Sequence, residues 1–314
     1  MSRRTRERGW PAAPEPLPVP VVDNHTHLES VLSFDVPGDG DAGGAPRTLD
    51  DHLARAAAVG VTRMVQVGCD LDAAAWTDAL LRERAAAGDR TLLGALAVHP
   101  NEAVLHAGVR EVAPDGLEPA PEARHDVPLG AAIARIEALA RGNERVRAIG
   151  ETGLDHFRAG PAGRRAQVEA FRAHIALAKE LGLALQIHDR DAHQDVIDVL
   201  LRDGAPERTV FHCYSGDAQM AEVCAEHGWY LSFAGPVTFK ANDGLREALR
   251  ATPLDRVLVE TDAPYLTPHP YRGRPNSPYL LPHTVRVVAE TLDRDLADVC
   301  AALAATSQDV YGPW

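Results

Sequence analysis

The sequence predicts an α/β protein built as a TIM-like (β/α)8 barrel, in a single domain with surface insertions. Short apolar runs and helical segments alternate eight times along the chain. Several apolar runs end in a side chain that can bind metal, the first at His25 and the last at Asp262. The length of 314 residues fits either one barrel of roughly 250 residues with insertions or two ordinary domains. The spread of the metal-capable side chains over most of the chain favours the single barrel.

Eight apolar or β-branched runs are expected to form the strands. They cover residues 19–23, 63–68, 92–98, 146–150, 183–187, 208–211, 229–233 and a last run that begins at Val257 and leads to Asp262. The last run turns at once through Ala263 and Pro264, which places the carboxylate of Asp262 at the carboxyl end of a strand. Barrel enzymes carry their chemistry at this end of the sheet.

Helices are expected between these runs, at about residues 48–60, 72–87, 129–141, 166–181, 192–202, 282–292 and 296–306. Thr48 and Asp51 resemble a capping box, and Gly182 suits a C-cap. A polar loop is expected at 152–158. Two surface insertions are also expected: residues 35–46, which are rich in glycine, aspartate and proline, and residues 108–128, which are rich in proline, glutamate and aspartate. Residues 1–18 are charged and then proline-rich, so we expect a flexible leader before a barrel domain of residues 19–314.

Composition indicates a cytoplasmic protein. The start of the chain is basic but continues into a proline-rich stretch where a signal peptide needs an apolar run, and no stretch approaches the roughly 18 apolar residues of a membrane span. The four cysteines have no CxxC spacing. The net charge of −13 excludes a general basic surface for duplex nucleic acid. A phosphate-bearing substrate would need a focused positive centre, which metal ions could supply.

Six residues at the expected strand ends are candidate metal ligands. His25 and His27 stand at i and i+2, so both imidazoles share one face and can converge on one cation. With Asp262 from the neighbouring last strand they could hold one ion. His188 and His212, from two further neighbouring strands, could hold a second, and Glu151 stands between the groups as a bridge. Each residue alone has an ordinary structural explanation, but six at the ends of five strands together indicate a metal site.

A two-metal site of this kind suits the hydrolysis of phosphodiesters. The ions would lower the pKa of a bound water towards about 7 and hold the phosphoryl oxygens, while Asp262 takes the water's proton. Candidates to orient phosphate are His99, Arg158, Arg190 and Lys240. Arg272, in a loop beyond the last strand, could reach substrate or could equally be a surface charge.

These motifs resemble the TatD-type metal-dependent deoxyribonucleases of the amidohydrolase superfamily. The matching segments are Asn24-His25-Thr26-His27-Leu28, Ala97-Val98-His99-Pro100, Gly150-Glu151-Thr152-Gly153-Leu154-Asp155, Ile187-His188-Asp189-Arg190-Asp191-Ala192, Phe211-His212-Cys213-Tyr214-Ser215-Gly216 and Glu260-Thr261-Asp262-Ala263-Pro264-Tyr265-Leu266-Thr267-Pro268. The resemblance continues through Arg272-Gly273-Arg274-Pro275-Asn276 and covers nearly the whole chain after residue 18.

The resemblance implies a TIM-like barrel and the metal-dependent removal of nucleotides from DNA 3′ ends. It also implies that the six candidates are the ligands, with Glu151 bridging and Asp262 near the attacking water. Three positions depart from the usual pattern and bear on metal preference and substrate fit. Asp189 stands where a small hydroxyl residue is common, His156 where an aromatic residue is usual, and Asn101 where histidine is frequent.

Two other functions remain open from the sequence. A metal-dependent hydrolase of small esters, lactones or amides would use the same scaffold, although many such enzymes carry a bridging lysine on strand four, where this chain has Glu151. A non-catalytic partner-binding barrel would be expected to have lost ligands, and none is lost. The ligand types suit Zn, Mn or Ni, with Mg bound more weakly. The expected partners are single-stranded DNA 3′ ends, and neither a membrane nor an obligate protein partner is expected.

Overall fold

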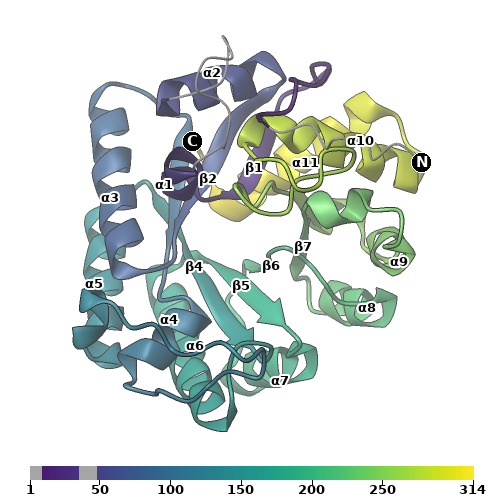
Figure 1. Ribbon diagram of the computed structural model, residues 1–314. Coiled ribbons are helices and arrows are strands. Elements are labelled where there is room, and N and C mark those ends of the chain that lie inside the picture. The colour runs from purple at the N-terminus through teal and green to yellow at the C-terminus, as the bar shows by residue number, and fades with distance from the viewer. Residues whose placement is uncertain (1–8, 35–47) are drawn as a thin grey trace, which may run out of the picture.

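The computed structural model describes residues 9–34 and 48–314, and its centre is an eight-stranded sheet (Figure 1). The strands pair in parallel and in sequence order from the first to the eighth. They are β1 (Val21–Thr26), β2 (Val61–Gly68), β3 (Leu92–Leu96), β4 (Val146–Asp155), β5 (Ala184–Arg190), β6 (Thr209–Phe211), β7 (Tyr230–Phe233) and β8 (Val257–Val259). This order confirms the predicted barrel.

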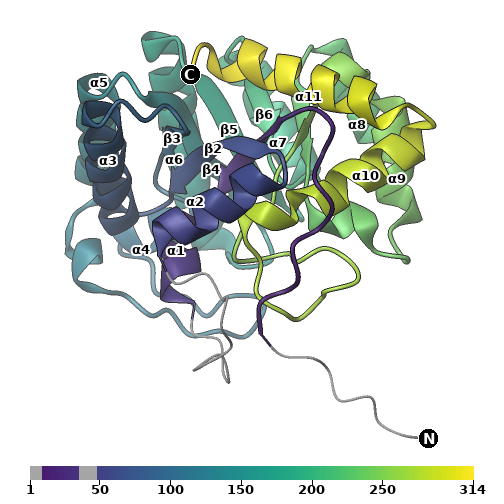
Figure 2. The same cartoon turned by 90° about the horizontal axis from the view of Figure 1, so that it is seen from above.

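Helices follow the strands and surround the sheet (Figure 1). They are α1 (Leu28–Ser33), α2 (Leu49–Ala58), α3 (Leu71–Ala86), α4 (Pro100–His106), α5 (Leu129–Gly142), α6 (Pro161–Leu181), α7 (His193–Asp203), α8 (Ala218–Glu226), α9 (Asp243–Ala251), α10 (Leu281–Leu292) and α11 (Leu296–Tyr311). Figure 2 shows α10 and α11 packed beside one another. The capping box of Thr48 and Asp51 is present, and Gly182 ends α6 with a left-handed φ of 62°.

Side chains and backbone of the first and last strands close the barrel. Asp23 accepts hydrogen bonds from the backbone nitrogen of Thr261 at 2.9 Å and from its hydroxyl at 2.5 Å. The carbonyl of His25 accepts from the nitrogen of Asp262 at 3.0 Å, and the nitrogen of His27 donates to Ala263 at 2.9 Å. The chain segments that carry His25, His27 and Asp262 are therefore fixed side by side.

The predicted polar loop at 152–158 was wrong in its first part, because β4 continues to Asp155. Residues Thr152 to Asp155 pair with Ile187 to Arg190 of β5, which is likewise longer than expected. This ladder satisfies the backbone of a buried segment whose polar side chains hide the strand pattern. Gly153 is required there: its φ is 145°, and an added Cβ would lie 2.0 Å from the carbonyl oxygen of His188.

Four helices, α1, α4, α8 and α9, were missed, each ten residues or shorter. They have few turns in which an apolar stripe can repeat, so periodicity identifies them poorly. Two of them begin with a side-chain cap, since His99 accepts from the nitrogen of Asn101 and Asp217 from that of Met220. The predicted insertion at 108–128 contains a 3-10 turn, Ala123–Asp126, and otherwise no helix or strand among its described residues.

Apolar side chains pack on both faces of the sheet, as expected for parallel strands under helices. The larger cluster joins the strands to the helices and includes Met64 and Phe171. The smaller cluster takes alternate positions of the strands, such as Val65 and Val67, and also includes Tyr311 near the end of α11. The centre of the barrel is thus a packed core on which the site residues rest.

Part of the predicted leader is described, and it lies against the barrel between α2 and α10 (Figure 2). Leu17 is buried and its nitrogen donates to Val59, while Arg286 of α10 donates to the carbonyls of Glu15 and Pro16. Residues 1–8, and the insertion predicted at 35–46, fall outside the described residues. Within the described part of the chain, no helix is both long and apolar enough to cross a membrane.

Candidate metal centre

The six residues predicted as ligands lie together at the carboxyl ends of the strands. His25 lies in β1, Glu151 in β4 and His188 in β5. His27, His212 and Asp262 follow β1, β6 and β8 within a few residues. All are buried except His188, which is partly exposed. Asp262 has a φ of 52°, a left-handed conformation that aspartate tolerates better than most residues.

Glu151 is the central contact of this group. Its Oε1 lies 2.6 Å from Nδ1 of His188 and 2.8 Å from Nε2 of His212. Its Oε2 lies 3.6 Å from Nε2 of His25 and 3.9 Å from Nε2 of His27. Asp262 adds an oxygen 3.4 Å from Nε2 of His27 and 3.9 Å from Nε2 of His25. One carboxylate therefore contacts two separate groups of imidazoles through its two oxygens.

An oxygen acceptor holds the outer nitrogen of each histidine in the first group. Nδ1 of His25 lies 3.1 Å from Oε1 of Gln186, and Nδ1 of His27 lies 3.1 Å from the carbonyl of Val67. The amide of Gln186 donates to Asn24 and Tyr311, which fixes its oxygen towards His25. Each Nδ1 therefore carries the proton in the neutral ring, and each Nε2 turns a lone pair towards the centre.

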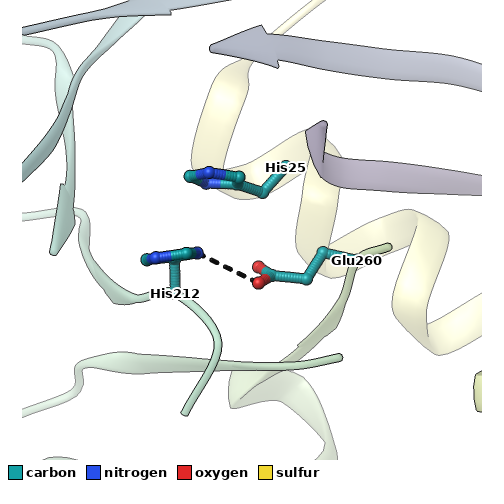
Figure 3. Close-up of side chains that lie close together, drawn as sticks. All are labelled: His25, His212 and Glu260. Atoms are coloured by element: carbon teal, nitrogen blue, oxygen red, sulfur yellow. Dashed lines mark hydrogen bonds and ion pairs between the residues drawn. The ribbon is translucent and has the colours of Figure 1, made fainter. Parts of the chain in front are cut away.

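The second group is held in the same way by carboxylates. Nε2 of His188 lies 3.3 Å from Asp155, and Nδ1 of His212 lies 3.1 Å from Oε1 of Glu260. Figure 3 shows Glu260 beside His212 and joined to it by the dashed line. The ring of His212 stacks on that of His25, with centroids 3.9 Å apart. Oε1 of Glu260 also accepts from the nitrogen of Cys213, while its buried Oε2 has no hydrogen-bond partner among the described residues.

This pattern of hydrogen bonds fits a divalent cation. The Nε2 atoms of His25 and His27, each presenting a lone pair, lie only 3.2 Å apart. The inner nitrogens of His188 and His212 likewise face a carboxylate oxygen at short range. Lone pairs and carboxylate oxygens at such distances repel unless a positive charge lies between them. The imidazole and carboxylate donors suit Zn, Mn or Ni.

The pKa values show how strongly this site attracts positive charge. Burial lowers the pKa of His27 and of His188, but nearby carboxylates, chiefly Asp262 for His27 and Asp155 with Glu151 for His188, raise each to about 9. Burial raises the pKa of Glu151, but the surrounding histidines, His212 above all, lower it by more. The pKa of this carboxyl is therefore held well below its usual range. The buried carboxylate is therefore charged.

His99, predicted to orient phosphate, faces the same carboxylate as a donor. Its Nδ1 accepts a hydrogen bond from the nitrogen of Asn101 at 3.1 Å, so the proton of the neutral ring is on Nε2. That Nε2 lies 3.5 Å from Oε1 of Glu151. His99 thus presents an N–H to the centre where the other histidines present lone pairs.

The other predicted phosphate contacts lie around the centre and not within it. Arg158 lies 3.8 Å from Asp115, and Arg190 stacks over the ring of Phe157 at 3.9 Å. Lys240 is exposed, and Arg272 stacks over the ring of Phe239 at 4.1 Å.

Each of the three departures from the family pattern has a partner. Oδ2 of Asp189 lies 2.8 Å from Nδ1 of His193, which offsets its added negative charge. His156 lies 3.5 Å from Asp195. Asn101 donates to Asp155 at 3.1 Å and so supports the residue that holds His188.

The sequence interpretation missed Gln186, Asp155 and Glu260, which orient the histidines. Gln186 and Glu260 stand two residues before His188 and Asp262, and Asp155 stands four after Glu151. Even spacing along a strand places side chains on one face, so this alternation was the available signal.

The chain is similar to known proteins over nearly its whole length. A family model described as TatD related DNase matches residues 22–312. The chain is 41% identical to an uncharacterized metal-dependent hydrolase TatD of Mycobacterium tuberculosis, over 93% of this chain and 98% of that protein. It is 34% identical to the 3′-5′ ssDNA/RNA exonuclease TatD of Citrobacter rodentium, over 63% of this chain and 75% of that protein. The solved structure of YJJV, a TatD homologue of Escherichia coli K12, has the same fold, with a TM-score of 0.74 at 24% identity over 94% of this chain and 98% of that one.

Proposed function

The chain belongs to the TatD-related DNase family and is a metal-dependent hydrolase, and on this premise we propose that it removes nucleotides from the 3′ ends of single-stranded DNA. The observation that carries the proposal is the position of Glu151, whose two oxygens face two separate groups of ligand-type side chains. A shared carboxylate of this kind is the usual bridge of a two-metal hydrolase.

We assign one divalent ion to each group. His25, His27 and Asp262 would hold the first, His188 and His212 the second, and Glu151 would bridge them. When bound, such a pair of ions would supply a water of lowered pKa and positive charge for the phosphoryl oxygens.

Side chains of the protein itself perform the proton transfer and the positioning. Asp262 is a second carboxylate at the centre and the base that takes the proton of the attacking water. The Nε2–H of His99 points at the centre and donates to a phosphoryl oxygen of the substrate. Arg158, Arg190, Lys240 and Arg272 lie around the centre and contact flanking phosphates.

Charge favours a phosphate substrate over a neutral one. Two divalent ions would outweigh the negative charges of Glu151 and Asp262, the two carboxylates that face them directly, and would give a phosphate a focused positive site inside a chain of net charge −13. Binding would therefore be short-range, with a few nucleotides and little sequence specificity. The name of the Citrobacter relative supports single-stranded nucleic acid.

A small-ester, lactone or amide hydrolase is less favoured, because β4 ends in Glu151 and neither of the two lysines of the chain lies on β4. A cytoplasmic location and the lack of an obligate protein partner stay predictions.

The test of substrate class compares four oligomers of one sequence: single-stranded DNA, the same strand with a 3′-terminal phosphate, duplex DNA and single-stranded RNA. Each is incubated with the metallated protein and resolved by size. We expect stepwise shortening of single-stranded DNA, slower shortening of the blunt duplex and loss of the product ladder with EDTA. Endonucleolytic fragments, or no cleavage of any strand, would contradict the proposal.

A further inference from the structure

We propose that two arginine–aromatic pairs beside the metal centre are stacking platforms for two bases of an unpaired nucleic-acid strand; this rests on the proposed nuclease function. We call them the Phe157 pair, formed with Arg190, and the Phe239 pair, formed with Arg272.

The Phe157 pair lies at the ends of the two strands that carry Glu151 and His188. Phe157 follows the end of β4, and Arg190 is the last residue of β5. The guanidinium carbon lies 3.9 Å from the centroid of the ring, a close stacking contact. Phe157 as a whole residue is nevertheless 37% exposed, although exposed phenylalanine is uncommon.

The Phe239 pair lies beyond β7 and β8, next to Asp262 in the order of the barrel. Phe239 follows the 3-10 turn Gly235–Thr238, and Arg272 comes from the loop after β8. Its guanidinium carbon lies 4.1 Å from the centroid of the ring. Tyr265 is 54% exposed, and its ring lies 6.0 Å from that of His27. Exposed or stacked aromatic rings thus occur after three different strands around the centre.

In the described part of the chain, the arginines of the two pairs keep their positive charge free of carboxylate partners, as several other arginines do. With 45 acidic residues against 32 basic ones, carboxylate partners are abundant, and Arg84, Arg124 and Arg141 each contact two or more. Among the residues that the structure describes, neither Arg190 nor Arg272 lies within ion-pair distance of a carboxylate. A guanidinium stacked on one face keeps its N–H edge for phosphate and its other face for a base.

The separation of the pairs defines the form of the substrate. One pair lies after β4 and β5 and the other after β7 and β8, so they stand on different sides of the metal centre. A strand that reaches both must turn its bases outward, which an unpaired strand does readily and a duplex does only by melting. Stacking on such surfaces tolerates any base. The pairs thus account for selection of unpaired 3′ ends without sequence preference.

The test measures binding, so that it is separate from cleavage. The full chain with Asp262→Asn is titrated, in Mn, against a 5′-fluorescein DNA oligomer, and fluorescence anisotropy is recorded. A single abasic site is then moved one nucleotide at a time from the 3′ end. We expect the affinity to fall roughly 10-fold at two positions near the 3′ end and to stay unchanged elsewhere.

Variants of the two pairs assign the positions. Phe157→Ala should remove the loss of affinity caused by the abasic site at one position, and Phe239→Ala should remove it at the other. If either phenylalanine variant fails to fold, Arg190→Ala or Arg272→Ala replaces it and should have the same effect. Arg256→Ala is the matched control: this arginine lies 5.0 Å from the ring of Tyr230, but just before β8, at the opposite end of the barrel. It should leave the whole profile unchanged.

Two results would overturn the platforms: equal affinity for all the abasic oligomers, or variants that weaken intact and abasic strands alike. Neither depends on cleavage. If the wild-type chain digests the intact strand while the profile is flat, only the platforms are wrong. If the affinity falls at two abasic positions but the metallated wild-type chain does not cleave the strand, the nuclease proposal fails and the platforms remain.

Discussion

Glu260 lies beside His212, with its Oε1 3.1 Å from Nδ1 of the imidazole (Figure 3), whose Nε2 faces Glu151 on the other side of the ring. The carboxylate is fully buried, and its other oxygen has no hydrogen-bond partner among the described residues. Such an arrangement fixes the tautomer of His212 and makes its inner nitrogen a stronger ligand.

Glu260→Gln should therefore weaken metal binding while the volume of the side chain is kept. We expect a loss of about 10-fold in affinity for Zn, within the usual range for residues that orient a ligand. A competition titration against a chromogenic zinc chelator measures this affinity. Glu290→Gln, at an exposed position of α10, is the control and should bind Zn as the wild type does. Equal affinity of all three proteins would show that Glu260 does not act on His212.

Gly153→Ala should disturb the strand that carries His188. The added Cβ would meet backbone 2.0 Å away, and the φ of 145° already disfavours alanine. We expect the free energy of unfolding to fall by roughly 2 kcal/mol or more, together with a loss of bound metal. Gly130→Ala, in helix α5 with nothing within 4 Å of the new Cβ, should leave stability unchanged or slightly raised. Urea unfolding of both variants checks this, and similar values for the two would refute the expectation.

The sequence predicted the barrel and the six clustered residues because both follow from simple periodic rules. Strand-end residues of a closed parallel barrel must converge, so His25 and Asp262 could be paired although 237 positions separate them. The sequence did not predict the residues that hold the outer ring nitrogens of the histidines. The acceptor of the His27 imidazole is the backbone carbonyl of Val67, which no sequence pattern identifies. The stacking of Arg190 on Phe157 depends on the paths of two loops, which local sequence does not determine.

His174 should make the protein less stable in mild acid. Its Nε2 accepts from the nitrogen of Val98 and its Nδ1 lies 2.9 Å from the hydroxyl of Thr152, so the buried ring is neutral. Burial lowers its pKa from 6.5 to about 4. Below pH 6.5 the unfolded chain takes up a proton that the folded chain does not, and stability falls until the pH reaches about 4.

The contribution of His174 between pH 7 and pH 5 should be about 2 kcal/mol. Urea unfolding at both values, for wild type and His174→Gln, isolates it, because the variant lacks this group and should lose less stability on acidification. The exposed His227 serves as the control, since His227→Gln should keep the wild-type difference. A variant of His174 with an unchanged pH dependence would show that this histidine is not the source.

Metal content should divide according to the two groups of ligands. His27→Ala and His188→Ala each remove a ligand from one group only, so each protein should retain about one ion where the wild type holds two. Glu151→Ala removes the shared carboxylate and should retain fewer than either. Elemental analysis after dialysis against metal-free buffer gives the numbers. A single ion in the wild type, lost completely with either histidine, would contradict the assignment of two sites.

The most direct test of the account follows a single-stranded DNA oligomer labelled at its 5′ end, with wild type and Glu151→Gln compared in Mg, Mn and Zn and the bound metal measured in the same samples. We expect a ladder that shortens from the 3′ end with the wild type, stops with EDTA, and is absent or at least 100-fold slower with Glu151→Gln. A fully metallated wild type that leaves the strand intact, or a Glu151→Gln variant that digests it at the wild-type rate, would contradict the claim that this carboxylate organises a nuclease centre.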